Sequence, residues 1–319
     1  MPKIVQCVPN FSEGRNQDKI NKIVEPFKGQ DGFKLVSVEP DADYNRTVVT
    51  LLGDPNKIIE ALIPFVGKVL EEIDMNVQKG EHPRMGAVDV IPFIPIEGVT
   101  MDECVKYAEE IGENINQSFD IPIFLYAEAA RQKRRIKLPT IRKGEFEGMK
   151  EKIKEEKWTP DFGENKIHPT FGVIGIGARN PLIAFNIDLD TAENKIASSI
   201  AKIIRGSSGG FGYIQAGPAF LEKRNHMQVT MNILDYKKNA IYRIVETVRM
   251  EAKRYQVNVT SCEVVGLIPK DAIVRSLQYY YASEGKAFPE MSLEDIAEDA
   301  KNILNFRDFD VFKIIEANM

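Results

Sequence analysis

One order of secondary-structure signals occurs twice along this chain, and it constrains the fold more than any single motif does. Runs of β-branched and aromatic residues predict strands, and apolar residues at helical spacing predict helices. In the first half these signals lie at 4–8, 17–27, 33–38, 46–52, 55–73 and 88–94. The order strand, helix, strand, strand, helix, strand is that of a ferredoxin-like unit.

The second half repeats this order, with signals at 182–187, 191–204, 213–217, 227–234, 238–255 and 262–268. The segments RTVVTLLGDPNKIIEAL, from Arg46, and HMQVTMNILDYKKNAIYRIV, from His226, also share a strand, an aspartate and a helix in register. Because each sheet must bury its apolar face against helices, the repeat predicts an α+β fold of two ferredoxin-like α/β subdomains, residues 1–178 and 179–319. Their sheets are expected to face a central cleft, the default place for a binding site.

The segment between the two repeats carries its own signals. Thr100, with Glu103 three residues later, predicts a capped helix that ends near Phe119, and residues 121–126 predict a strand. Residues 129–167 are polar and basic, so we expect an excursion over the surface and the best place for a binding loop.

Composition excludes several classes of protein. With 319 residues, 43% of them hydrophobic, the chain can fill a substantial core, and no apolar run approaches the roughly 20 residues of a membrane span. The start of the chain has no signal-peptide pattern, so a cytoplasmic location is expected. A net charge of −5 argues against general nucleic-acid binding. The basic run Arg131–Lys137 either attracts an anionic partner or is a solvated surface segment.

The three cysteines, Cys7, Cys104 and Cys262, lie far apart with no paired spacing. This spacing argues against a disulfide framework and against a zinc site, so no metal is expected.

Chemistry is most plausible in the stretch GEHPRMGAVDVIPFIP, from Gly80 to Pro95. His82 precedes Pro83, which disfavours helical backbone and places the ring at a chain reversal. Arg84 and Asp89 follow on the same stretch. An imidazole with an ordinary pKa of about 6.5 can exchange protons near neutral pH. Two interpretations stand side by side: a proton-transfer group, or a structural histidine bonded to Asp89 or to backbone.

Several separated motifs, taken in order, resemble the glutamate formimidoyltransferase family. They are VPNFSEGRN at Val8, NRTVVTLLGDP at Asn45, KGEHPRMGAVDVIPFIP at Lys79, LYAEAAR at Leu125, WTPDFG at Trp158, GIGARN at Gly175 and AFNI at Ala184. The resemblance extends to about Leu277 and implies a free-standing transferase without the cyclodeaminase half of the vertebrate bifunctional enzyme. It implies transfer of the formimino group from N-formimino-L-glutamate to N5 of tetrahydrofolate, which is a co-substrate that can be polyglutamylated. It also implies a homodimer.

The resemblance assigns roles to individual residues. The family's proton acceptor falls on His82. A carboxylate that orients the imidazole and stabilises the cationic amidine falls on Glu39, where the family has aspartate, with Asp89 as the second candidate. Arg46 is expected to pair with a substrate carboxylate, or else with Glu39 or Asp43. Independently of the resemblance, His226 is expected to have a structural role.

The folate-binding segment of the family falls on Gly163–Gly172, where ENKIHPT departs from the vertebrate pattern. The residues expected to bind folate or substrate are Asn10, Arg46, Arg84, Gly163, Glu164, Asn165, Lys166, Ile167, His168, Pro169, Thr170, Phe171, Gly172, Gly177 and Arg179. Two alternatives stay open: transfer with another donor (formiminoglycine, or 5-formyltetrahydrofolate with glutamate), and a folate-binding protein without turnover.

Overall fold

The computed structural model describes residues 2–42, 44–221 and 224–319, and the chain divides into two compact units, Met1–Asn180 and Pro181–Met319. Each unit has its own hydrophobic core. In the described ranges, none of the helices combines the length and the apolar character that a membrane crossing requires. The cleft expected between the two sheets stays a prediction.

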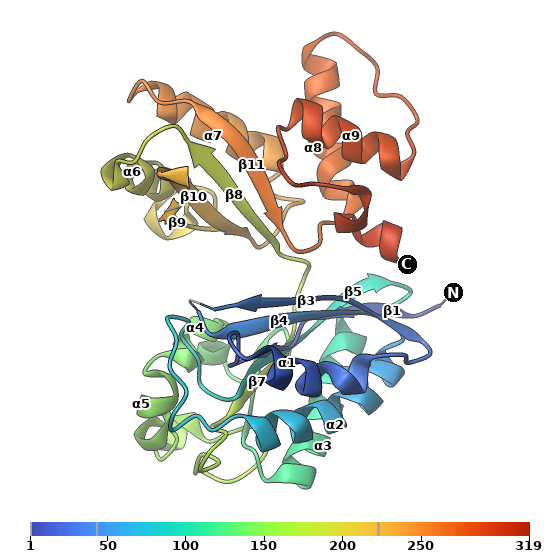
Figure 1. Cartoon of the computed structure of the whole chain (residues 1–319), viewed down its shortest axis with the longest axis vertical. Helices are drawn as coiled ribbons and strands as arrows, with labels where there is room; N and C mark the ends of the chain where they lie inside the picture. The colour runs from blue at the N-terminus through green and yellow to red at the C-terminus, as the bar shows by residue number, and fades with distance from the viewer. Residues whose placement is uncertain (1, 43, 222–223) are drawn as a thin grey trace. The chain divides into compact units, whose positions relative to one another are not determined.

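The first unit combines a mixed sheet with helices (Figure 1). Its strands are β1 (Ile4–Cys7), β2 (Asn10–Phe11), β3 (Phe33–Asp41), β4 (Arg46–Gly53), β5 (Val88–Glu97), β6 (Ile123–Ala127) and β7 (Ile174–Ala178). Its helices are α1 (Gln17–Val24), α2 (Pro55–Glu72), α3 (Met101–Phe119), α4 (Leu138–Arg142) and α5 (Glu145–Lys152), with 3-10 turns η1 (Glu25–Phe27), η2 (Lys133–Arg135) and η3 (Glu156–Trp158).

The sheet of the first unit contains the expected ferredoxin-like unit and extends beyond it. Strand β3 pairs with β4, β4 pairs with β1 and β2, and both of these pair with β5, all antiparallel. Strand β7 then pairs in parallel with β5 and with β6. The sequence did not predict β7, because the alternating glycines of Ile174–Ala178 weaken a strand signal.

Local sequence explains where the two long helices of this unit begin. The Asp54 side chain accepts a hydrogen bond from the Asn56 N–H, and Pro55 occupies the first turn of α2. Thr100 and Glu103 form the predicted capping box of α3. Both helices bury an apolar stripe in the core of the first unit.

The expectation that residues 129–167 form only a surface excursion is wrong for a good part of that segment. Ile141, Phe146 and Met149 from α4 and α5 are buried in the first core. Arg135, in the basic run, is also fully buried, and its Nη1 donates to Asp161 at 2.6 Å. A basic composition suggested solvent exposure, but an arginine can be buried when its charge is paired, as that of Arg135 is with Asp161.

The second unit confirms the repeated order. Its elements are β8 (Ile183–Leu189), α6 (Asn194–Ile204), η4 (Gly206–Ser208), β9 (Ile214–Leu221), β10 (His226–Ile233), α7 (Ile241–Lys253), β11 (Val259–Val265), α8 (Lys270–Ser283), α9 (Leu293–Ile303), η6 (Val311–Lys313) and η7 (Ile315–Asn318). Its sheet has the order β11, β8, β10, β9, all antiparallel. Helix α8 packs against α7, and α9 packs against α8.

Candidate functional site

The loop that carries His82 is fixed on one side by Asn45. Its Oδ1 accepts the Gly14 N–H at 2.9 Å, its Nδ2 donates to the Lys79 carbonyl at 2.8 Å, and its own carbonyl accepts from Gln78 at 3.1 Å. Asn45 has a positive φ of 48°, a conformation that asparagine adopts more readily than most residues. The NRT motif therefore connects the loop of Gly14, the start of β4 and the loop before His82.

The segment 168–173 fixes the loop on its other side. The Ala87 N–H donates to the Phe171 carbonyl at 2.8 Å, and the Val173 N–H donates to the Met85 carbonyl at 3.1 Å. A Cβ atom on Gly172 would lie 2.4 Å from the Met85 carbonyl oxygen, so only glycine permits this approach. The backbone that presents His82 is thus bonded to the segment for which the resemblance implies folate binding.

His82 is half-buried, and its ring centroid lies 6.0 Å from that of Tyr44. Burial lowers the pKa of His82 to about 3, and the charges of Arg46, Arg142 and Arg84 act in the same direction. The imidazole is therefore neutral at neutral pH and able to accept a proton.

Asp89 does not hold His82. The carboxylate is buried, its Oδ1 accepts the Met85 N–H at 3.0 Å, and its Oδ2 accepts Arg142 Nη2 at 2.5 Å. Burial raises the pKa of Asp89, and the charge of Arg142 opposes that rise. Across residues 2–42, 44–221 and 224–319, no hydrogen bond of the His82 ring is found. The structural interpretation of His82 as a residue bonded to Asp89 therefore has no support.

The arginines around His82 differ in how well they are paired. Arg84 is buried and donates to Glu145 at 2.9 Å and to Glu147 at 2.8 Å. Arg46 has its guanidinium carbon 5.6 Å from the centre of the Tyr44 ring, and burial lowers its pKa. Its alternative partner Asp43 lies outside the described residues. The pairing of Arg46 with a substrate carboxylate stays a prediction.

Arg142 and Tyr126 extend the group of polar side chains, and sequence reasoning named neither. Arg142 ends α4, within the segment expected to bind a ligand but with no motif that singles it out. Tyr126 is buried on β6, and Arg179, Arg142 and Asp89 all act on it electrostatically. A Cβ on Gly177 would lie 2.8 Å from the Tyr126 ring, so this glycine leaves room for the phenol.

The other predicted site residues lie in different settings. Glu39 is exposed on β3, opposite Val48, and Asn10 is half-buried on β2, where its Nδ2 donates to the Val8 carbonyl at 2.9 Å. Gly177 lies within β7, and Arg179 follows that strand, where burial lowers its pKa. Their roles in binding or catalysis stay predictions.

The segment Gly163–Gly172 divides into an exposed and a buried part. Glu164, Asn165 and Lys166 are exposed, whereas Ile167 and Phe171 belong to the core. His168 lies between these parts, and its Nδ1 accepts the Phe171 N–H at 3.2 Å. Burial lowers the pKa of His168, which favours the neutral ring that this acceptor role requires.

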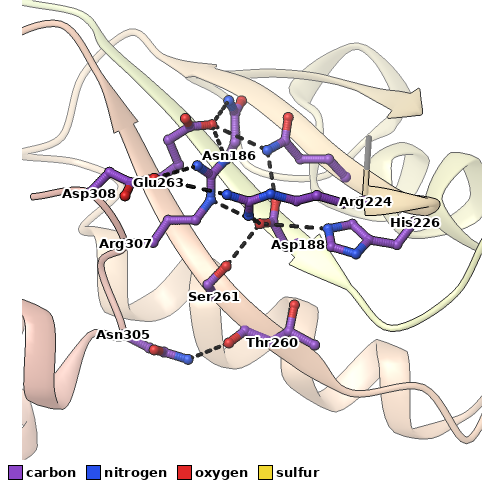
Figure 2. A network of polar contacts seen from close by, with 11 residues as sticks. Asn186, Asp188, Arg224, His226, Thr260, Ser261, Glu263, Asn305, Arg307 and Asp308 are labelled. Carbon is purple, nitrogen blue, oxygen red and sulfur yellow. Dashed lines mark hydrogen bonds and ion pairs between the residues drawn. The ribbon is translucent and has the colours of Figure 1, made fainter. Parts of the chain in front are cut away.

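A second polar cluster lies in the second unit, around the fully buried Asp188 (Figure 2). Its carboxylate accepts from Gln228 at 2.7 Å, Ser261 at 2.8 Å and Arg307 at 3.0 Å. The Nε2 of His226 is 3.8 Å from Asp188 Oδ2. That nitrogen is buried and has no hydrogen-bond partner in the described chain, so the structural role of His226 stays a prediction.

Metal-binding side chains do not gather in the described ranges. No group of three or more histidine, cysteine, aspartate or glutamate residues there has the arrangement of a metal site. Cys7, Cys104 and Cys262 are free and buried, and burial raises the pKa of the Cys104 and Cys262 thiols to about 12.

Comparisons with known proteins cover both units. The family model for the N-terminal subdomain of the formiminotransferase domain matches residues 4–179, and the model for the formiminotransferase domain matches residues 184–316. The glutamate formimidoyltransferase of Streptococcus pyogenes serotype M1 is 48% identical over 92% of this chain and 99% of its own length. That of Thermoplasma acidophilum is 42% identical over 88% of this chain and 93% of its own. The formimidoyltransferase-cyclodeaminase of Rattus norvegicus is 40% identical over 89% of this chain and 53% of its own.

Proposed function

The chain belongs to the formiminotransferase family, and from that premise we propose that it transfers the formimino group of N-formimino-L-glutamate to N5 of tetrahydrofolate, with His82 as the group that moves the proton. The products are L-glutamate and 5-formiminotetrahydrofolate. Matches that cover both units, together with two relatives named glutamate formimidoyltransferase, support this transferase activity. The alternatives of another donor or of binding without turnover are not favoured.

The main support for this role of His82 is its neutral imidazole, which lies on a loop held by hydrogen bonds from Asn45 on one side and from residues 171–173 on the other. When N5 of the folate attacks the amidine carbon, N5 becomes positively charged and must lose its proton. The imidazole accepts that proton. It then returns the proton to the glutamate nitrogen as the bond between this nitrogen and the former amidine carbon breaks. One histidine serves both steps, because the same proton is taken from one amine and given to the other.

Several neighbours have proposed parts in this reaction. A carboxylate, from Glu39 or from Asp89, stabilises the cationic amidine carbon as the attack proceeds. Asn10, Arg84, the segment Gly163–Gly172, Gly177 and Arg179 are proposed to contact folate or donor. The hydrogen bonds between residues 85–87 and 171–173 support this, because they keep the folate-binding segment next to the loop of His82.

A homodimer, a cytoplasmic location and the division into subdomains 1–178 and 179–319 belong to the same proposal. The resemblance of the motifs to the family supports the first two. The repeated order of elements supports the third. Light scattering on the purified protein would give the mass of the particle in solution, and a single-chain mass would contradict the dimer.

The test of the proposed function is to incubate the purified protein with N-formimino-L-glutamate and tetrahydrofolate. We expect 5-formiminotetrahydrofolate and L-glutamate to form in equal amounts. The matched control omits the folate and should release no glutamate, since the formimino group then has no acceptor. Glutamate release without folate would indicate hydrolysis instead, and no product in either mixture would refute the proposed transfer.

A further inference from the structure

Two buried guanidinium nitrogens near His82 lack partners. The Nε atoms of Arg46 and Arg142 are inaccessible to solvent, and neither has a hydrogen-bond partner within the described chain. Leaving a buried charged donor unpaired costs free energy. Unsatisfied groups of this kind are rare in folded proteins, and each one calls for an explanation, of which a ligand is one.

The neighbouring carboxylates do not pair with every N–H donor of Arg46 and Arg142. Arg142 reaches Asp89 through Nη2, and Asp89 already accepts a second hydrogen bond, from the Met85 N–H. Among the described residues, Asp41 and Asp89 are the carboxylates whose charges act most on Arg46. Arg84, the third arginine near His82, is paired with two glutamates on the exposed side of α5. Arg46 and Arg142 thus each keep one donor without a partner, and the charges of both act on the His82 imidazole.

We propose that Arg46 and Arg142 together bind a carboxylate of the donor substrate and hold it beside the His82 ring. This inference rests on the proposed function, which supplies a donor with two carboxylates. Guanidinium groups suit this task, because their planar arrangement of N–H donors matches the two oxygens of a carboxylate. Arg142 belongs to α4 and Arg46 to β4, so the carboxylate would connect segments that are far apart in the sequence.

The chemistry of the donor gives an independent reason for such a pair. Its amidine group is cationic, and the attacking N5 also becomes cationic, so three arginines around His82 would repel the reacting atoms. A carboxylate of the donor, placed between Arg46 and Arg142, offsets that repulsion. The arginines would then discriminate against donors that lack the carboxylate, because such donors leave the positive charges unopposed.

A second consequence concerns the basicity of His82. In the part of the chain that the structure describes, the charges that act on its ring are those of Arg46, Arg142 and Arg84. Asp89 pairs with Arg142, and the centroid of the Tyr44 ring lies 6.0 Å from that of His82. An added carboxylate places negative charge next to the imidazole, so its pKa should rise when the donor binds. The free protein would hold a weak base, and the bound donor would make that base stronger.

The kinetic test compares Arg46→Gln with Arg275→Gln. Arg275 is a matched control, because it is exposed on α8 and pairs with Asp271 at 2.7 Å. We expect Arg46→Gln to raise the KM for formiminoglutamate about 10- to 100-fold, because hydrogen bonds to a charged group contribute about this much to binding. The KM for tetrahydrofolate should stay within about twofold of the parent value. A donor KM that stays within about twofold of the parent value would overturn the inference while the proposed function stands.

Arg142 needs a paired change, because Arg142→Gln alone leaves the buried Asp89 without its cation. The double variant Arg142→Gln/Asp89→Asn removes both charges together and can be compared with Asp89→Asn alone. We expect the double variant to have the higher donor KM. Equal donor KM values for these two folded variants would exclude Arg142 from the carboxylate site.

A binding test works without turnover and separates the two proposals. The parent protein is titrated with glutarate while the His82 imidazole signals are followed by NMR, and glutaramide, which has no charge, is the control ligand. We expect glutarate to shift the signals and raise the His82 pKa, and expect Arg46→Gln to abolish both effects. If glutarate leaves His82 unchanged, the inference fails even when the protein transfers the formimino group. If glutarate acts as expected but no transfer occurs, the carboxylate site stands and the proposed function fails.

Discussion

The two units present the same kinds of residue in two different states of hydrogen bonding. Each unit has a buried aspartate that accepts a hydrogen bond from an arginine. Asp89 accepts from Arg142 in the first unit, and Asp188 accepts from Arg307 in the second (Figure 2). Around Asp188, Arg307 donates both to that aspartate at 3.0 Å and to Glu263 at 2.6 Å. Near His82, the Nε atoms of Arg46 and Arg142 have no partner in the described chain, whereas the unpartnered buried atom beside Asp188 is His226 Nε2 and not a guanidinium nitrogen. The difference teaches that the pairing of the arginine donors, more than residue type, distinguishes a structural cluster from one arranged for a ligand.

The largest effect should separate the two histidines. His82→Gln removes the proposed proton carrier, so the transfer rate should fall about 10²- to 10⁴-fold. His226→Gln is the matched control and should keep the rate within a few-fold of the parent. Initial rates at saturating substrates measure both. Equal losses in the two variants would abolish the contrast between the units.

The second prediction concerns the network of the second unit. Asp188→Asn removes the charge that pairs with Arg307 and Arg224, so the free energy of unfolding should fall by about 1.5–3 kcal/mol, the range for hydrogen bonds to a charged group. The loss stays in this range because Arg307 keeps Glu263 as a partner. Asp308→Asn is the control, since this exposed carboxylate contacts the same Arg307 at 3.1 Å. We expect the control to lie within about 0.5 kcal/mol of the parent in urea unfolding. A similar small loss for both would mean that the buried network adds little stability.

A third prediction uses a glycine from each sheet. A Cβ on Gly177, in β7, would lie 2.5 Å from the Tyr126 carbonyl oxygen, whereas nothing lies within 4 Å of a Cβ on Gly217, in β9. Gly177→Ala should therefore cost about 1–3 kcal/mol of stability through overpacking, and Gly217→Ala should be nearly neutral. Thermal unfolding compares the two. Equal melting temperatures would show that the first sheet can adjust around Tyr126.

The smallest effect is the pH dependence of stability that His82 contributes, because water screens its half-exposed ring. Its pKa in the folded protein is about 3, below the ordinary value of 6.5. Between these values the unfolded chain binds the proton and the folded chain does not. Stability should therefore fall as the pH falls from 6.5 towards 3. Urea unfolding of the parent and of His82→Gln should show a weaker pH dependence in the variant, and identical slopes would contradict the low pKa.

Much of the fold followed from periodicity in the sequence, and the reasons are local. The capping box at Thr100 and the Asp54–Pro55 start of α2 depend on residues a few positions apart, so the sequence displays them directly. Strand β7 was not predicted, because the glycines in it are required by contacts from other segments. Met85 packs against Gly175, and Tyr126 packs against Gly177. Such contacts leave no periodic signal.

The candidate site divides along the same line. His82, Arg84 and Asp89 are close in sequence and were named together, and Arg46 came from a matched motif. Arg142 was missed, because only the folded path of residues 128–173 brings it to Asp89, 53 positions away in the chain. In a basic segment, the sequence gives no sign that Arg142 differs from a solvent-exposed arginine. Arg135 was misjudged for the same reason.

The claim on which this account depends is that a neutral imidazole at position 82 carries the proton, and chemical rescue tests it most directly. His82→Gly removes the ring and leaves a space that free imidazole can enter. The account predicts that added imidazole restores transfer in a saturable way, while the same addition leaves the parent rate unchanged. If a folded His82→Gly variant that binds both substrates shows no response to imidazole, or transfers at the parent rate without it, the claim is contradicted.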